Sequence, residues 1–285
     1  MSKHQIVFVK PNSIEPCPRS GHRCVTDGMY MYVFGGFNPN ARAKLFSEIW
    51  CFNLSLQTWT KIITSGPSPP CVASSTLVLQ RRNLIVFGGS GYPFGMQNSN
   101  KTYICDLRAK KWQEINSGLN LNSPSASYGQ SAVIGPDNCM YVFGGTKGLE
   151  YNNDLHKMSL ESFSWEHIRC ERAPLPRYRH EAVGIDGGFL VIGGYGLHGA
   201  CALDKVSVFK YEHNVWETIN CCGFNGGEFP APRRALSCVR FNDMVYICGG
   251  YSETNSNSNE HFAYNDLWEL DLKTFSWHKI DQVIT

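Results

Sequence analysis

The run Tyr32-Val-Phe-Gly-Gly36 is one of five short apolar stretches in the sequence that end in two glycines. Its counterparts are Ile85-Val-Phe-Gly-Gly89, Tyr141-Val-Phe-Gly-Gly145, Leu190-Val-Ile-Gly-Gly194 and Tyr246-Ile-Cys-Gly-Gly250. Successive glycine pairs are separated by 53, 56, 49 and 56 residues. A recurrence at this spacing predicts a chain built from repeated supersecondary units.

A tryptophan follows each glycine pair and lies five residues after an apolar or aromatic position. The five are Trp59, Trp112, Trp165, Trp216 and Trp277. The constant spacing indicates a tight turn between two strands. In the first unit we predict four short strands, which together form one blade, at 22–26, 29–34, 48–53 and 58–63. The glycines are expected where the backbone needs a positive φ or approaches a neighbour closely, and the tryptophan is expected to pack between adjacent blades.

Units of about 50 residues with a double glycine and a downstream tryptophan resemble the kelch-repeat family of β-propellers. The resemblance covers residues 17–281, and it is specific because the motif recurs five times in register. It predicts an all-β, kelch-type β-propeller over residues 17–285. The expected units are about 17–65, 66–119, 120–171, 172–222 and 223–285.

The apolar run Gln5-Ile-Val-Phe-Val9 lies within residues 1–16, before the first unit begins. We predict five complete four-stranded blades plus this N-terminal strand, which would close the last blade of an incomplete sixth. Two interpretations remain open: a five-bladed ring with an extra edge strand, or a six-bladed design that is truncated. Truncation is favoured because an open propeller would leave exposed strand edges, which invite aggregation.

The bulk composition excludes several classes of function. A formal net charge of +2 gives no reason to expect binding to nucleic acid or to an anionic membrane. Neither a signal peptide nor a long apolar segment is visible, which favours a cytosolic or nuclear location. The twelve cysteines are scattered without a CxxC pair, which favours reduced thiols. We therefore expect no metal site and no cofactor.

Arginine is concentrated where the first strand of each predicted blade begins. Sixteen residues before the first glycine of each pair the sequence has Arg19, Val72, Tyr128, Arg177 and Arg233. Two residues further on, the sequence has Gly21, Ser74, Gln130, Arg179 and Ala235. Arg234 and Lys147 add further polar groups, so we predict a binding rim that consists of Arg177, Arg179, Arg233, Arg234, Arg19, Tyr128, Gln130 and Lys147.

A guanidinium can bind a carboxylate through two parallel hydrogen bonds, which favours a peptide-carboxylate site at this rim. The alternative is that the arginines pair with nearby acids such as Glu181 or donate to loop carbonyls. Tyr195 and Tyr251 directly follow glycine pairs and either stack on a ligand or contact a neighbouring blade. His22 and His180 occupy matching positions, and hydrogen bonding within the repeat is favoured for both.

Several runs resemble a subgroup of kelch proteins that act as substrate receptors of Cullin 2 ubiquitin ligases. They include Arg19-Ser-Gly-His-Arg-Cys24, Gly88-Gly-Ser-Gly-Tyr-Pro-Phe-Gly95, Arg177-Tyr-Arg-His-Glu181 and Arg233-Arg-Ala-Leu-Ser-Cys238. The resemblance implies recognition of protein C-termini that end in Gly or Ala. Elongin B/C and Cullin 2 are expected partners only if a longer chain supplies the docking segment that follows the last blade in this subgroup.

Two other functions are weighed against this one. The chain could be a generic kelch scaffold in cytoskeletal or stress-signalling complexes, without ubiquitin ligase output. It could instead be an enzyme of the copper-radical oxidase type, which would need convergent His, Tyr and Cys ligands. The sequence does not place such ligands together, so we predict a binding protein rather than an enzyme.

Overall fold

The computed structural model describes residues 14–115, 122–223, 226–253 and 261–281. Within these ranges the regular structure consists of β-strands, and no α-helix is present. A search of the same residues accordingly found no helix able to cross a membrane. The predicted N-terminal strand at residues 5–9 lies outside the described residues.

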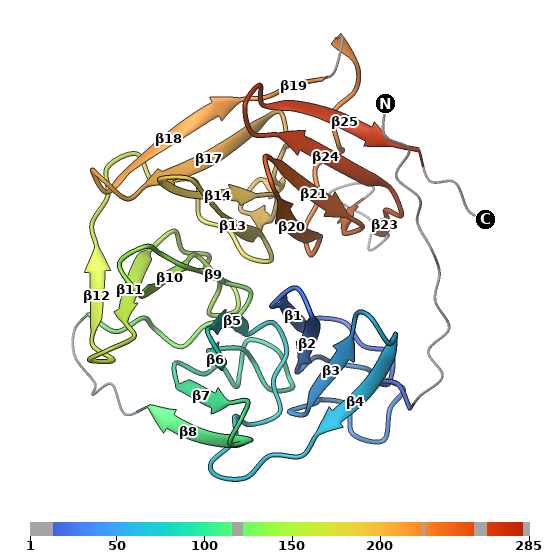
Figure 1. Ribbon diagram of the computed structural model, residues 1–285. Coiled ribbons are helices and arrows are strands. Elements are labelled where there is room, and N and C mark those ends of the chain that lie inside the picture. Colours follow the sequence, from blue (N-terminus) through green and yellow to red (C-terminus); the bar gives the residue numbers. More distant parts are fainter. Residues whose placement is uncertain (1–13, 116–121, 224–225, 254–260, 282–285) are drawn as a thin grey trace. The chain divides into compact units, whose positions relative to one another are not determined.

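Five sheets each contain a blade of four strands (Figure 1). Blades one and two consist of β1 (Arg23–Thr26), β2 (Tyr30–Phe34), β3 (Ile49–Asn53), β4 (Thr58–Ile62), β5 (Thr76–Gln80), β6 (Asn83–Phe87), β7 (Thr102–Asp106) and β8 (Lys111–Ile115). Blade three consists of β9 (Ser131–Ile134), β10 (Cys139–Phe143), β11 (Leu155–Ser159) and β12 (Trp165–Ile168). Blade four consists of β13 (Glu181–Ile185), β14 (Gly188–Ile192), β17 (Lys205–Lys210) and β18 (Val215–Asn220). Blade five consists of β20 (Ser237–Phe241), β21 (Met244–Cys248), β24 (Leu267–Asp271) and β25 (Ser276–Ile280). The predicted all-β fold of five four-stranded propeller blades is confirmed.

Additional short strands extend blades four and five. The hairpins β15 (Tyr195–Gly196) with β16 (Gly199–Ala200) and β22 (Tyr251–Glu253) with β23 (His261–Ala263) lie between the second and third strands of these blades. The strand β19 (Cys222–Gly223) pairs in parallel with β25. The two hairpins therefore lengthen the loops at the end of the blade where the first strand begins.

The chain divides into two compact units. The N-terminal unit contains residues 9–150 and 156–167, and therefore blades one to three. Blades four and five belong to the C-terminal unit, which includes residues 151–155 and those from 168 onward. Within each unit, first strands of neighbouring blades contact each other: β1 contacts β5, β5 contacts β9, and β13 contacts β20. The segments that enter these first strands are thereby brought together within their unit.

The double glycines connect each blade to the next one in the same unit. Gly193 has a φ of 63°, and a Cβ there would lie 2.7 Å from the carbonyl oxygen of Arg233. The N–H of the second glycine donates across the same boundary, from Gly194 to Arg233 at 2.9 Å and from Gly36 to Val72 at 3.0 Å. Only glycine combines this positive φ with such a close approach. The expected role of the glycine pairs is confirmed.

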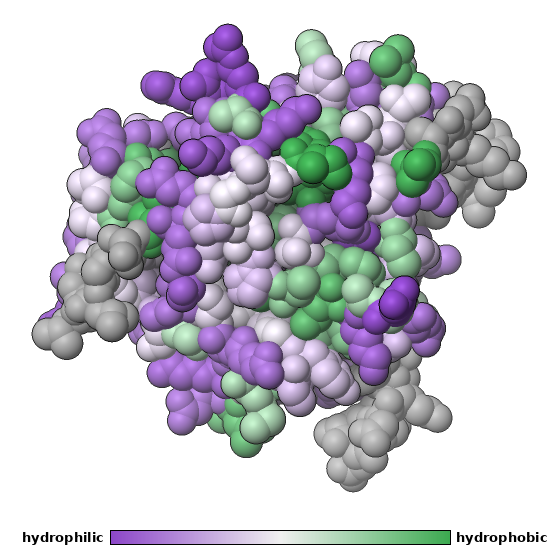
Figure 2. All heavy atoms as spheres, turned by 90° about the horizontal axis from the view of Figure 1, so that it is seen from below, coloured by the Kyte–Doolittle hydropathy of each residue, from purple (hydrophilic) through white to green (hydrophobic). Residues whose placement is uncertain are grey.

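Packing between sheets explains the continuous apolar runs of the second strands. Residues 84–87 of β6 are each at most 2% exposed, as expected for a strand covered on both faces. Blade five differs, because β21 alternates between more and less buried residues, and Val239 and Phe241 of β20 are 51% and 67% exposed. On the face drawn in Figure 2, hydrophobic side chains form separate groups between hydrophilic ones.

Three of the repeat tryptophans contact the preceding blade of their unit. The ring of Trp112 lies 5.7 Å from that of Phe34 in blade one, and the ring of Trp165 lies 5.0 Å from that of Phe87 in blade two. Trp277 donates from Nε1 to the carbonyl oxygen of Leu203 in blade four at 2.9 Å. The expected packing of these rings between blades is confirmed here.

Candidate functional site

The segment that enters each first strand has the same backbone geometry in all five blades. One residue there has a positive φ, and the five are Gly21, Ser74, Gly129, Arg179 and Ala235. These residues form interblade hydrogen bonds within each unit, from Ser74 N–H to Gly21 and from Ala235 N–H to Arg179. The left-handed conformation of Arg179 is therefore part of the repeat and is not a strain confined to one site.

Counting residues back from the glycines misplaces blade three by one position. The turn between β9 and β10 has three residues inside the hydrogen bond from Gly135 N–H to Cys139, and the matching turn of blade four has two, between Ile185 and Gly188. Tyr128 bridges to Thr146 just as Tyr178 bridges to Tyr195. Tyr128 is therefore equivalent to Tyr178, and not to Arg177 as the count predicts.

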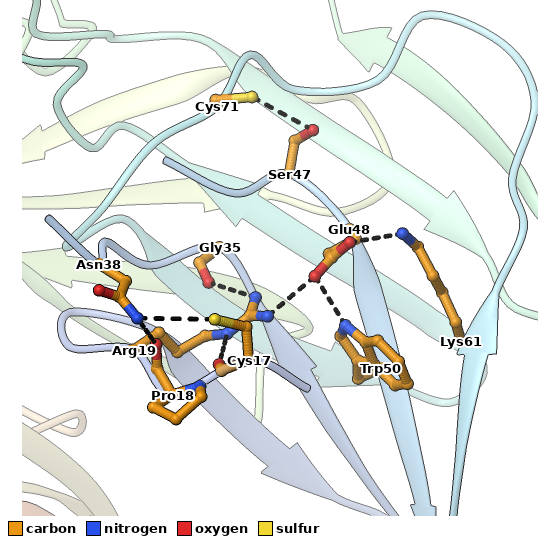
Figure 3. Close-up of polar contacts among 10 residues, drawn as sticks. All are labelled: Cys17, Pro18, Arg19, Gly35, Asn38, Ser47, Glu48, Trp50, Lys61 and Cys71. Atoms are coloured by element: carbon orange, nitrogen blue, oxygen red, sulfur yellow. Dashed lines mark hydrogen bonds and ion pairs between the residues drawn. The ribbon is translucent and has the colours of Figure 1, made fainter. Parts of the chain in front are cut away.

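Arg19 forms a framework of hydrogen bonds within blade one (Figure 3). Its Nε donates to the carbonyl oxygen of Cys17 at 2.9 Å, and Nη1 donates to that of Gly35 at 3.2 Å. Nη2 pairs with the carboxylate of Glu48 at 2.8 Å. The same carboxylate oxygen accepts from Nε1 of Trp50 at 2.8 Å. Arg19 thus links the entering segment to the end of the second strand and the start of the third.

Arg233 repeats this arrangement in blade five. Nε donates to the carbonyl oxygen of Ala231 at 2.9 Å, and Nη1 donates to that of Gly249 at 3.1 Å. Both terminal nitrogens bind Asp266, with Nη2 2.9 Å from Oδ2, and Trp268 donates to the same carboxylate. The side chain of Arg233 is fully buried. The sequence signal of this framework is an acid two residues before a tryptophan, which the arginine count overlooked.

Arg177 lacks the acid in blade four. It donates from Nε to the carbonyl oxygen of Leu175 at 3.1 Å and from Nη1 to that of Gly193 at 3.2 Å. The strand pairing shows which residue replaces the acid in blade four. Ser207 pairs with β14 at the position where Trp50 pairs with β2 and Trp268 pairs with β21. The residue two positions before Ser207 is Lys205, so a lysine stands where blades one and five have their acid. Among the described residues Arg177 has no carboxylate partner, and burial lowers its pKa. The proposed peptide-binding role of these three arginines stays a prediction, and the contacts fit the framework alternative.

The contacts of the Glu48 carboxylate lead us to predict that the N-terminal unit loses stability in acid. Burial raises its pKa, but hydrogen bonds from Lys61, Arg19 and Trp50 outweigh that effect and lower the pKa to about 2. Because the folded pKa lies below the ordinary value of 4.5, the stabilisation is complete above that value and is lost as the pH falls toward 2. At pH 7 the Glu48→Gln variant should have a lower free energy of unfolding than the unmodified chain. Between pH 4.5 and 3 this free energy should fall less in the variant than in the unmodified chain. Urea denaturation of both proteins at pH 7, 4.5 and 3 checks this. An equal loss of stability in both proteins as the pH falls would contradict it.

Arg234 lies at the centre of a different group in the C-terminal unit. Nη1 donates to the hydroxyl of Tyr178 at 3.0 Å, and Nη2 pairs with the carboxylate of Glu253 at 3.0 Å. The guanidinium carbon lies 4.1 Å from the ring centre of Tyr195 and 4.8 Å from that of Tyr251. Its Nε is buried and has no hydrogen-bond partner in the described residues. The residue is only 7% exposed, so the cation is held among aromatic rings.

Arg179 brings a second cation to the same group. Its Nη1 donates to the hydroxyl of Tyr251, and its guanidinium carbon lies 5.5 Å from the ring centre of Tyr178. Tyr151 stacks on Tyr178 with ring centres 5.3 Å apart. We call this group the tyrosine–arginine cluster; it consists of Arg179, Arg234, Tyr151, Tyr178, Tyr195, Tyr251 and Glu253.

The tyrosine–arginine cluster already holds a carboxylate. Arg234 binds Oε1 of Glu253, and the hydroxyl of Tyr195 donates to Oε2 at 2.9 Å. The hydrogen bond to Glu253 is also the main reason why the pKa of Tyr195 is raised. One guanidinium group and one hydroxyl group of the cluster therefore hold this carboxylate by charge-assisted hydrogen bonds.

The remaining predicted residues lie in the N-terminal unit. Tyr128 is 8% exposed and its ring is stacked on Phe94, with centres 6.5 Å apart. Gln130 is fully buried, and its main-chain oxygen accepts from Arg23 at 3.1 Å. Lys147 is exposed. The structure thus brings Arg179 and Arg234 together in one unit, and the ligand roles of Tyr128, Gln130 and Lys147 stay predictions.

A search of the described residues found no group of three His, Cys, Asp or Glu side chains that could hold a metal. All twelve cysteines are free thiols. Burial lowers the pKa of His22, which favours a neutral imidazole.

Comparison with known proteins gives one family. The family model described as the KLHDC2/KLHL20/DRC7 Kelch-repeats domain matches residues 1–170 and 97–283. Kelch domain-containing protein 10 of Xenopus tropicalis is 38% identical over 286 residues, which cover 96% of this chain and 67% of that protein. The Homo sapiens protein of the same name is 38% identical over 279 residues, covering 93% of this chain and 61% of its own length. A Drosophila melanogaster homolog is 30% identical over 301 residues, covering 94% of this chain and 48% of the fly protein.

Proposed function

The chain belongs to the kelch-repeat family of β-propellers, and from this premise we propose that it is the substrate-recognition subunit of a cullin-RING ubiquitin ligase. The family and the five-bladed fold support a protein-binding scaffold. In our proposal the C-terminal unit binds the terminal carboxylate of a target protein that ends in Gly or Ala, and it binds without catalysing a reaction.

The bound side chain of Glu253 is the observation that carries this proposal. Its carboxylate is held by Arg234 and Tyr195 in a partly buried setting, where charge-assisted hydrogen bonds are strong. A peptide terminus presents the same group. In the proposal, the N–H groups of Arg179 that do not contact Tyr251 donate to the terminus, and Arg234 donates to it where it replaces Glu253. An internal peptide segment without Asp or Glu has no carboxylate to offer, so the cluster would distinguish a chain end from such a segment.

The preference for small terminal residues and the ligase output rest on the resemblance to C-terminal degron receptors. Attachment to elongin B/C and Cullin 2 requires a docking segment, which a longer chain would supply. Immunoprecipitation of the endogenous protein followed by mass spectrometry tests this part. Recovery of elongin and cullin subunits supports it, and repeated recovery of substrates without either subunit favours a scaffold that has no ligase output.

Peptide titration tests the carboxylate site. A fluorescent peptide that ends in glycine with a free carboxylate should bind, and the same peptide with a C-terminal amide should bind at least about 30-fold more weakly. Arg179→Ala should weaken binding of the free acid and leave binding of the amide nearly unchanged. Glu253→Gln should strengthen binding of the free acid, because it removes the internal carboxylate that competes for Arg234.

Arg240→Ala is the matched control for these variants. Arg240 lies on β20 of blade five, the blade that also carries Arg234 and Glu253. It pairs with Asp186, which is 92% exposed, away from the tyrosine–arginine cluster. This change should affect neither peptide. Equal affinity of the unmodified protein for the acid and the amide would show that the cluster does not read a chain terminus.

A further inference from the structure

We infer that the N-terminal unit carries a separate docking surface for an acidic peptide segment that also presents an apolar side chain. The surface consists of aromatic and apolar side chains from the loops between the second and third strands of blades one and two, with basic residues at its edge. We call it the aromatic loop surface, and it contains Phe37, Tyr92, Phe94 and Met96. It is independent of the tyrosine–arginine cluster and does not require a terminal carboxylate.

The rings of the aromatic loop surface contact one another and remain accessible. Phe37 stacks on Tyr92 with centres 5.7 Å apart and an interplanar angle of 10°. The edge of Phe94 meets Phe37 at 5.0 Å and Tyr92 at 5.8 Å. Tyr92 is 52% exposed and Met96 is 81% exposed. Grouped aromatic and Met side chains at a surface are typical of protein interfaces.

Hydrogen bonds hold the loop that carries Tyr92 and Phe94 in one conformation. Gly95 N–H donates to the hydroxyl of Ser90, which in turn donates to the carbonyl oxygen of Gly91, both at 3.0 Å. Asn98 connects this loop to that of blade three by donating to Lys147 at 3.0 Å. A preformed loop loses little conformational freedom when a partner binds, which favours a docking role over a role in packing alone.

The charge of the surrounding loops selects an acidic partner. Residues 37–46, 90–99 and 146–150 contain three cations and one carboxylate, namely Arg42, Lys44, Lys147 and Glu150. Nζ of Lys44 lies 5.6 Å from the ring centre of Tyr92, at the edge of the exposed rings. Carboxylates beside an apolar side chain would complement this arrangement.

Single-stranded nucleic acid also uses aromatic rings and basic residues. It needs free ring faces on which bases stack and a basic groove along its backbone. Here Phe37 covers one face of Tyr92, and the three cations lie on loops of an otherwise nearly neutral chain. These observations favour a peptide.

Peptide display tests the inference. Random twelve-residue peptides, fused at their C-terminal side so that no free terminus is offered, are selected on the immobilised full chain. We expect enriched sequences to combine Asp or Glu with Leu, Phe, Tyr or Trp. An amidated, labelled copy of the most enriched peptide should bind more weakly by about tenfold or more to the double variant Tyr92→Ser, Phe94→Ser. It should also bind more weakly to Lys44→Glu with Lys147→Glu, and more weakly at high salt.

Two controls locate the effect. Lys273→Glu changes an exposed cation of blade five and should leave binding unchanged, as should Arg179→Ala. Thermal unfolding should show that the double variant is folded, since Tyr92 is half exposed. Failure to enrich acidic sequences, or equal binding to the surface variants, would overturn the inference. Competition by a labelled oligouridylate for the same side chains would assign the surface to nucleic acid instead.

Discussion

Replacing Asp266 by alanine is expected to lower the free energy of unfolding of the C-terminal unit by about 3–5 kcal/mol. The reason is the position of Arg233, whose side chain is fully buried and whose two terminal nitrogens both bind Asp266. Without the carboxylate, a cation would remain in the interior with only carbonyl oxygens and the ring of Tyr264 as partners, and Trp268 would lose the acceptor of its N–H. Urea denaturation followed by tryptophan fluorescence measures the loss.

An exposed ion pair of the same blade provides the control. Asp243 lies 2.6 Å from Lys273, but their side chains are 49% and 74% exposed. Solvent screens such a pair, so Asp243→Ala should change stability little. Adding Arg233→Met to Asp266→Ala should restore part of the loss, because the unpaired buried charge is then gone. If Asp266→Ala is no more destabilising than Asp243→Ala, Arg233 does not depend on its carboxylate.

Arg233 and Arg234 show why neighbouring arginines of the predicted rim have different environments. Consecutive side chains of an extended segment point to opposite sides. Arg233 therefore lies in the framework of its own blade, beside Asp266, and Arg234 lies among the tyrosines. A count of arginines in this segment combines a structural role with a proposed binding role.

The five blades follow from the sequence because glycine pairs and tryptophans are local signals that recur in every unit. The predicted site depended on aligning the first strands of the blades by counting residues, and an insertion in a turn makes such a count wrong. One extra residue in the turn between β9 and β10 shifts Tyr128 relative to Tyr178, and only the strand pairing reveals it. The partners of Arg19 and Arg233 were readable as an acid two residues before a tryptophan. Glu253 was not readable in this way, because the β22–β23 hairpin places it beside Arg234.

The repeat tryptophans allow the packing between blades to be measured. Trp277→Ala is expected to destabilise the C-terminal unit by about 3–5 kcal/mol, the range found when a large buried ring is removed. Trp277 is 1% exposed and belongs to a core formed by blades four and five together. The change would leave a cavity between these blades and remove the hydrogen bond to the carbonyl oxygen of Leu203. The midpoint of urea denaturation should fall accordingly.

Trp59 occupies the same position of the repeat in blade one and serves as the matched comparison. It is partly exposed, and its ring lies 4.9 Å from that of Phe52 in its own blade. Because less of this ring is buried, Trp59→Ala should lower stability clearly less than Trp277→Ala. Trp277→Phe should recover part of the packing but not the N–H donor, which separates the two contributions. Similar losses for Trp59→Ala and Trp277→Ala would mean that the tryptophan contributes through its own hairpin and that contact with the preceding blade adds little.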